Sequence, residues 1–127
     1  MMEFTFADIR LEHPLTRRRL DVRALIDSGF VFLTIPEHVA IQLGFDLNDG
    51  PLREVMLGDG SRQSAPMIGP LRVWFQDRYC DLSALVIGNE PLFGAVPIEM
   101  MDLVLNPAAQ KLTVNPESPD VPSAVLK

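Results

Sequence analysis

Ala24-Leu25-Ile26-Asp27-Ser28-Gly29 places an acidic side chain in a Ser-Gly turn at the end of an apolar segment. Upstream, apolar residues alternate with Asp21 and Arg23, which is the period of a strand with one buried face. We therefore expect a strand over residues 18–26, the second arm of a hairpin whose first arm starts near Phe4 and is broken at 12–14. Alone, an Asp-Ser-Gly triplet is common, and its simplest interpretation is a turn closed by the aspartate.

The segment after this turn carries the clearest helix signal of the chain. Thr34-Ile35-Pro36-Glu37 has the Thr-x-x-Glu spacing of a capping box, with Pro36 in the first turn. Ile35, Val39 and Leu43 then recur at helical spacing before Gly44. The pattern predicts a helix of two to three turns that ends at Leu43-Gly44.

The rest of the chain is dominated by strand patterns and turns. Gly58-Asp59-Gly60 predicts a tight hairpin turn, and Pro66 and Gly69-Pro70 interrupt its return arm. The further elements expected are strands over 54–57, 71–75 and 79–87, a short helix over 97–101, and a hairpin of 103–105 with 111–114. Many short strands with one or two short helices predict a mainly β protein, folded as a small closed β-barrel.

The length of 127 residues, 47% of them hydrophobic, suits one domain with its own core. We place this domain at residues 1–115. From Pro116 the composition shifts to Pro, Ser, Glu and Asp, so residues 116–127 are expected to form a flexible C-terminal tail.

Charge and cysteine content exclude several classes of function. A net charge of −6 lacks the basic surface that nucleic acids or anionic lipids need. No apolar run is long enough to span a membrane, and the start Met1-Met2-Glu3 lacks the order of a signal peptide. One cysteine, Cys80, excludes an internal disulfide framework and fits a reducing compartment. We expect a cytoplasmic protein without nucleic-acid or membrane partners.

The order of these motifs resembles the retropepsin-like aspartic proteases, in particular the small prokaryotic single-domain members of that clan. The resemblance runs from about residue 18 to residue 114. It rests on Asp27-Ser28-Gly29, on the glycine-bearing hairpin at 58–60, and on Leu92-Phe93-Gly94 with a short helix after it.

The resemblance implies a role for each matching residue. Asp27 would be the catalytic aspartate, Ser28 would hydrogen-bond between two catalytic loops, and Gly29 would let the backbone approach the substrate. Leu92, Phe93 and Gly94 would support the catalytic loop from behind. Gly58, Asp59 and Gly60 would form the tip of a flap that contacts substrate.

The chain holds one such triplet and is about half as long as a two-lobed pepsin, so the resemblance implies a homodimer with one Asp27 from each subunit. Two carboxylates a few ångströms apart share one proton, and such a pair can activate water and polarise the scissile carbonyl of a peptide or protein substrate. The predicted function is therefore that of an aspartic endopeptidase without a cofactor.

Phe30 departs from the small residue, most often Ala, that follows the catalytic glycine in the family. A ring at this position would fill the substrate floor, narrow the specificity or abolish cleavage. A non-catalytic peptide-binding or dimerisation module of the same fold is therefore an alternative. A third possibility is a small β-barrel of unrelated function, in which Asp27-Ser28-Gly29 is only a turn.

Other residues with reactive side chains fit structural roles better. His13 and His38 have no second ligand at metal-binding spacing, so no metal site is expected. Cys80 has no histidine placed to activate it and is expected to be a buried, inert thiol. Arg17-Arg18-Arg19 fits a solvated hairpin turn. Asp59 between two glycines suits a tight turn whether or not the hairpin is a flap.

Overall fold

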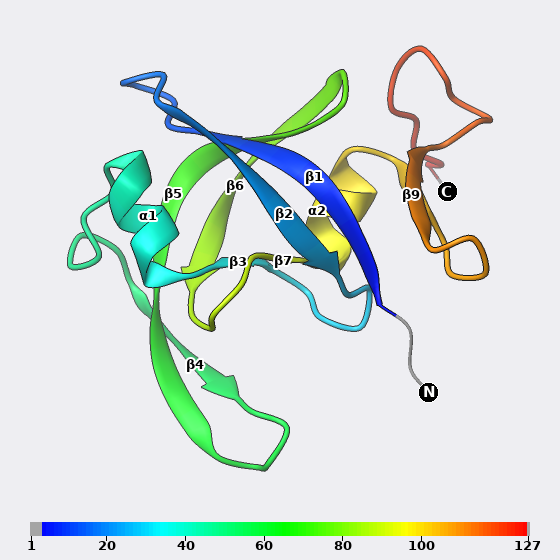
Figure 1. Cartoon of the computed structure of the whole chain (residues 1–127). Helices are drawn as coiled ribbons and strands as arrows, with labels where there is room; N and C mark the ends of the chain where they lie inside the picture. The colour runs from blue at the N-terminus through cyan, green and yellow to red at the C-terminus, as the bar shows by residue number, and fades with distance from the viewer. Residues whose placement is uncertain (1–3, 127) are drawn as a thin grey trace.

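The computed structural model describes residues 4–126 and consists mainly of strands with two short helices (Figure 1). Residues 1–3, on which the expectation about a signal peptide rests, and residue 127 of the expected tail lie outside the described residues. The elements are β1 (Thr5–Glu12), β2 (Arg19–Ile26), β3 (Leu33–Ile35), α1 (Glu37–Leu43), β4 (Leu52–Met56), β5 (Arg62–Phe75), β6 (Arg78–Val86), β7 (Leu92–Phe93), α2 (Ala95–Met100), β8 (Leu103–Asn106) and β9 (Lys111–Val114).

Six strands form a closed ring of hydrogen-bonded neighbours. Their order is β1-β2-β7-β3-β6-β5, and β5 returns to β1 through the antiparallel pairs Arg10↔Trp74, Leu11↔Val73 and Glu12↔Arg72. The pairs β2–β7 and β3–β6 are parallel, while the other pairs in the ring are antiparallel. β4 adds to the free end of β5, and β8 and β9 form a separate two-stranded sheet. The prediction of a mainly β fold with one or two short helices is confirmed.

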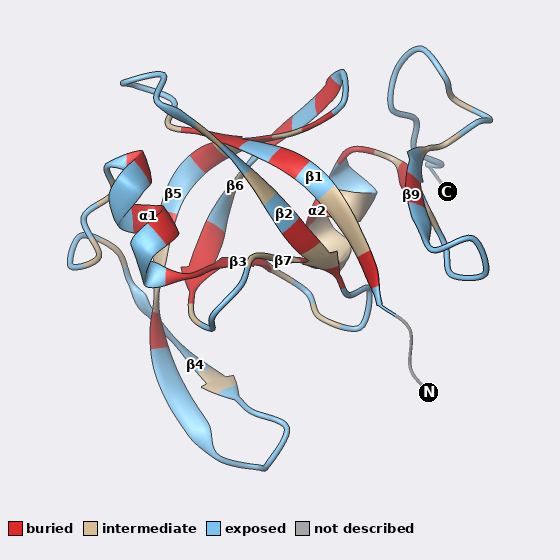
Figure 2. Ribbon diagram, viewed as in Figure 1, coloured by how far each residue is buried: buried red, intermediate tan, exposed pale blue. Residues whose placement is uncertain are grey.

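The core lies inside the ring and between the ring and the two helices (Figure 2). The alternation expected in the second arm is present, because Ala24 and Ile26 are buried while Asp21 and Arg23 are exposed. The largest fully buried apolar side chains are Phe93, Leu11, Leu33, Ile35, Leu43, Leu71, Leu85, Met101 and Val73. Burial of this kind stabilises a domain by about 25 cal/mol for each Å² of apolar surface.

The capping box predicted at Thr34 is wrong. Thr34 is buried in β3, where it pairs with Leu92 of β7 and Leu85 of β6. The helix begins at Glu37 after Pro36, and no side chain caps it. β3 has a paired strand on each side, and these pairings keep Thr34 in the sheet. Thr34 therefore does not cap the helix, although its local sequence favours that role. The predicted end is confirmed, because Gly44 closes the helix at φ 95°.

Three other elements also differ from the expectation in their bounds. The break predicted at 12–14 comes one residue later, since Glu12 ends β1 and is only 1% exposed. The interruption predicted at Gly69-Pro70 is present as a shift of register between Ile68 and Leu71. It does not divide the return arm into two strands, because β5 runs from Arg62 through Pro66 to Phe75. The second helix begins at Ala95, two residues before the expected start.

The segment after β9 contacts the body at several points. The Asp102 carboxylate accepts hydrogen bonds from the Asn115 side chain (3.1 Å), from the Ser118 hydroxyl and from the Ser123 N–H (2.9 Å). The buried Arg78 donates to the carbonyl oxygens of Met101, Asp102 and Ser118. The domain boundary at residue 115 and the flexibility of the tail stay predictions.

Candidate active site

Asp27 lies directly after β2, and its side chain is exposed. Its Oδ1 accepts a hydrogen bond from the Gly29 N–H at 3.0 Å, while its own carbonyl oxygen accepts one from the Phe30 N–H at 3.2 Å. The backbone N–H of Asp27 donates to the carbonyl oxygen of Phe93 at 3.1 Å. The aspartate is therefore held in a tight turn that presents its outer carboxylate oxygen to the surface.

Leu92-Phe93-Gly94 lies directly behind this turn. β7 pairs in parallel with β2, with Leu25 opposite Leu92 and Ile26 opposite Phe93. A Cβ at Gly94 would lie 2.6 Å from the carbonyl oxygen of Phe30 and closer still to that of Phe32, so only glycine fits here. The first residue of α2 also binds the loop, because the Ala95 N–H donates a hydrogen bond to the carbonyl oxygen of Phe30 at 2.7 Å.

Ser28 and Val31 expose their side chains in this loop. The hydroxyl of Ser28 makes no hydrogen bond among residues 4–126. Val31 is 51% exposed although it is apolar. Phe30 is half-buried, and its ring meets that of Phe32 edge to face, with centroids 6.2 Å apart. The turn and the residues after it therefore expose a carboxylate, a hydroxyl and an apolar side chain.

The β4–β5 hairpin extends away from the body and is exposed from Met56 to Ser64 (Figures 1 and 2). Its turn is closed by the Leu57 N–H donating to Ser61 O at 2.8 Å, and Gly60 adopts φ 86°. Asp59 caps the turn, and the hydrogen bond from the Ser61 hydroxyl lowers the pKa of its carboxyl. No heavy atom lies within 4 Å of a Cβ built at Gly58 or Gly60, so the tip is surrounded by open space.

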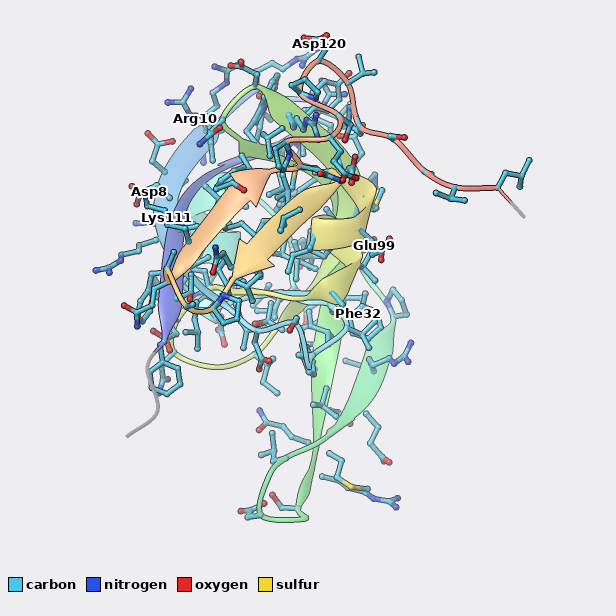
Figure 3. All side chains as sticks on the ribbon, turned by 90° about the vertical axis from the view of Figure 1, so that its right-hand side faces the viewer. Asp8, Arg10, Phe32, Glu99, Lys111 and Asp120 are labelled. Carbon is cyan, nitrogen blue, oxygen red and sulfur yellow. The ribbon has the colours of Figure 1, made fainter. Side chains whose placement is uncertain are left out.

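Arg53 is a candidate residue that the sequence interpretation missed. It lies in β4, and its guanidinium carbon is 4.8 Å from the centroid of the Phe32 ring. Figure 3 shows Phe32 on the side of the body from which the β4–β5 hairpin extends. This cation–π contact joins the base of the hairpin to the loop that carries Asp27. The alternation of β4 could have shown that Arg53 shares a face with Val55, but not that this face turns toward Phe32.

The remaining reactive residues have structural surroundings. Burial raises the pKa of the Cys80 thiol to about 12, so the thiol is unreactive at neutral pH. His13 stacks on Phe45, and its Nδ1 accepts hydrogen bonds from two backbone N–H groups. Across residues 4–126, no group of three or more His, Cys, Asp or Glu side chains is placed to hold a metal ion.

The arginine triplet at 17–19 is exposed but not free. Arg17 and Arg19 both bind the buried carboxylate of Glu12, at 3.1 and 3.0 Å, and Arg18 donates to a backbone carbonyl of α1. Trp74 Nε1 also donates to Glu12, and these partners lower the pKa of its carboxyl, with Arg17 having the largest effect. The triplet thus stabilises the turn between β1 and β2.

Two solved structures match this arrangement over almost the whole chain. The retroviral protease-like domain of Ddi1 from Leishmania major aligns with a TM-score of 0.63 and 13% sequence identity, covering 91% of each chain. The fold is retropepsin-like. A retropepsin-like aspartic protease from Rickettsia conorii aligns with a TM-score of 0.58 and 16% identity, covering 89% of this chain and 94% of that one.

Comparisons with protein-family models and with curated proteins gave no match. In residues 4–126, none of the helices has the length and apolar character required to cross a membrane. The structure brings Asp27, Gly29 and Phe30 together with Phe93 and Gly94, while their catalytic and supporting roles stay predictions.

Proposed function

We propose that the chain is an aspartic endopeptidase that acts as a homodimer on extended peptide or protein segments. The observation that supports this most is the position of Asp27, exposed in a turn that Phe93 and Gly94 hold from behind. A carboxylate on a rigid, backbone-bonded turn is preorganised for catalysis, because little reorganisation is needed when substrate binds.

The chemistry requires two such carboxylates. One Asp27 from each subunit would form a pair in which like charges prevent both groups from ionising together. One carboxylate would take a proton from water while the other, protonated, donates a hydrogen bond to the scissile carbonyl. The apparent pKa values would then belong to the pair and not to either subunit.

A homodimer is the simplest way to supply the second carboxylate, because the sequence holds a single Asp-Ser-Gly triplet. The hydroxyl of Ser28, which follows Asp27 and has no hydrogen-bond partner among residues 4–126, suits a hydrogen bond across a two-fold axis, where the same group meets its symmetry mate. In the same proposal, Gly29 leaves room for the substrate backbone, and Leu92 supports the loop through β7.

The exposed hairpin with Gly58, Asp59 and Gly60 at its tip would serve as the flap. Closure over a bound peptide would exclude water and strengthen the electrostatic interactions of the carboxylate pair. No cofactor is needed for this reaction. A free, buried thiol at Cys80 fits a reducing compartment, and we include a cytoplasmic location in the proposal.

The alternative is a peptide-binding or dimerisation module of the same fold that does not cleave. The ring of Phe30 favours it, since the ring lies in the loop of Asp27 and packs edge to face on Phe32. In this case Phe30 would occupy the floor on which a substrate backbone would lie.

Cleavage of a diverse peptide pool tests the proposal. We would compare the wild type with Asp27→Asn from about pH 4 to pH 7, at concentrations where sedimentation shows a dimer. The expected result is cleavage by the wild type and none by the variant, with equal sedimentation and thermal stability. Cleavage by both proteins, or none by a wild-type dimer, would refute the peptidase; Phe30→Ala would then test whether the ring blocks the site.

A further inference from the structure

Two arginines differ from the others in having no polar partner within the described part of the chain. Of the nine arginines in the sequence, Arg23 and Arg53 form neither an ion pair nor a side-chain hydrogen bond among residues 4–126. Each lies over a phenylalanine ring instead, Arg23 over Phe6 at 4.5 Å and Arg53 over Phe32 at 4.8 Å. The seven with polar partners are Arg10, Arg17, Arg18, Arg19, Arg62, Arg72 and Arg78.

Arg53 belongs to the face of the hairpin that turns toward the catalytic loop. Residues directly opposite in an antiparallel pair share a face, so Arg53 shares its face with Ala65, which is 1% exposed. Glu54 and Arg62 lie on the other face, where they form an exposed ion pair of 3.2 Å. Arg53, which has no ion pair among the described residues, therefore lies on one face of the hairpin, and Arg62, which is paired with Glu54, lies on the other.

Stacking prepares Arg53 to bind a carboxylate. A guanidinium that lies over a ring keeps its N–H donors, which point outward in its own plane, and their planar fork matches two carboxylate oxygens. The backbone of Phe32 is held because its carbonyl oxygen packs against Gly94, and its ring meets that of Phe30 edge to face. The cation is thus held in position before any ligand arrives.

Two acidic side chains lie at the same hollow as Arg53 without occupying these donors. Asp46 and Asp49 border the same hollow as Arg53 at the base of the hairpin, yet neither forms an ion pair with it among the described residues. Asp46 accepts a hydrogen bond from the Asn48 N–H instead, at 2.9 Å.

We propose that Arg53 is a specificity-determining residue that binds an acidic side chain of the peptide substrate. The inference rests on the proposed peptidase function and names its substrate class. That class is extended peptides with a Glu or Asp near the scissile bond and apolar residues beside it. The apolar positions would contact Val31 and Phe30, which follow Asp27 in the same loop.

Matched peptides test this inference. Starting from one sequence cleaved in the pool, a single Glu or Gln is moved along the positions on both sides of the scissile bond. We expect the wild type to cleave the Glu peptide about 10-fold faster than the Gln peptide at one position, as suits a charge-assisted hydrogen bond at an open site. Arg53→Met should remove the preference, and Arg53→Glu should transfer it to a Lys peptide.

Arg62→Met is the matched control, because it removes a cation from the outer face of the same hairpin and should leave the preference intact. Equal rates for Glu and Gln peptides at every position, with cleavage intact, would overturn the role of Arg53 and leave the peptidase standing. A uniform increase in the cleavage rates of all peptides with Arg53→Met would show that the contact with Phe32 restrains the hairpin. That result would also overturn the role of Arg53 in substrate specificity.

Binding separates this inference from the function on which it rests. The same Glu and Gln peptides, labelled with a fluorophore, are titrated into Asp27→Asn with and without Arg53→Met, and anisotropy is measured. If nothing is cleaved but the Glu peptide binds about 10-fold more tightly only when Arg53 is present, the peptidase fails and the acidic-peptide site stands. If neither cleavage nor a binding preference is seen, both fail.

Discussion

Gly94→Ala is the sharpest test of how the loop that carries Asp27 is held. The added methyl carbon would lie 2.6 Å from the carbonyl oxygen of Phe30 and closer still to that of Phe32. A carbon and a carbonyl oxygen in contact need about 3.3 Å. The loop that carries Asp27 must therefore move by at least about 0.7 Å. Gly94 itself has φ −90°, so the cost comes from the contact and not from its backbone conformation.

The magnitude follows from two losses. Overpacking of a well-packed site costs about 1–3 kcal/mol, and stretching the 2.7 Å hydrogen bond from Ala95 to Phe30 O adds about 0.5–1.5 kcal/mol. For a chain of this length the total of about 1.5–4.5 kcal/mol lowers the Tm by roughly 5–15 °C. Under the proposed function, a displacement of about 0.7 Å in the loop of Asp27 lowers kcat/KM by on the order of 10- to 100-fold.

Thermal unfolding and peptide cleavage measure the two effects, at one fixed protein concentration because a dimer has a concentration-dependent Tm. Gly58→Ala is the stability control, since its methyl group would meet nothing within 4 Å and the change should be neutral or slightly stabilising. A Tm for Gly94→Ala within about 2 °C of the wild type would show that the loop adapts, and would refute the reasoning.

Three further outcomes follow from groups outside the loop. The pKa of Glu12 is lowered below its usual value of 4.5 by Arg17, so its contribution to stability is present above that pH and is lost as the pH falls through the lowered pKa. The gap in Tm between wild type and Glu12→Gln should therefore narrow as the pH falls from about 7 to 3, while the exposed Glu54→Gln should show a small gap throughout. Cys80 should react with iodoacetamide at about pH 8 at least about 100-fold faster in urea than in the native protein; equal rates would place the thiol at the surface. Asp102→Ala removes the acceptor for Ser118, so limited proteolysis after β9 should become several-fold faster; an unchanged rate would mean that this carboxylate does not hold the segment.

The elements of the candidate site could be predicted because each depends on a short, local pattern of residues. An apolar segment followed by Asp27-Ser28-Gly29 predicts a strand that ends in a turn, and the structure has both. Leu92-Phe93-Gly94 repeats the apolar-then-glycine pattern, and β7 lies beside β2. Gly58-Asp59-Gly60 predicts a hairpin turn, which is also present.

The errors share a cause, which is competition from distant partners. Thr34 carries a local capping signal, but strands on both sides of it hold it in the sheet. Glu12 precedes His13-Pro14 and looks like a turn residue, yet Trp74, 62 positions later, helps to bury its carboxylate. The contact between Arg53 and Phe32 depends on how the hairpin base meets the loop, which no local pattern specifies.

Closure of the strand ring has a kinetic consequence. β1 pairs first with β2 along the chain, and its second partner strand, β5, lies much later in the sequence, as in the pair Arg10↔Trp74. The pairing of β1 with β5 therefore has to bring together residues that are far apart in the sequence. Proteins built on such distant pairings fold in about milliseconds to seconds. Trp74 is the only tryptophan, it lies in the closing strand, and its indole donates to Glu12. Its fluorescence therefore reports directly on the moment at which the ring closes, without an added probe.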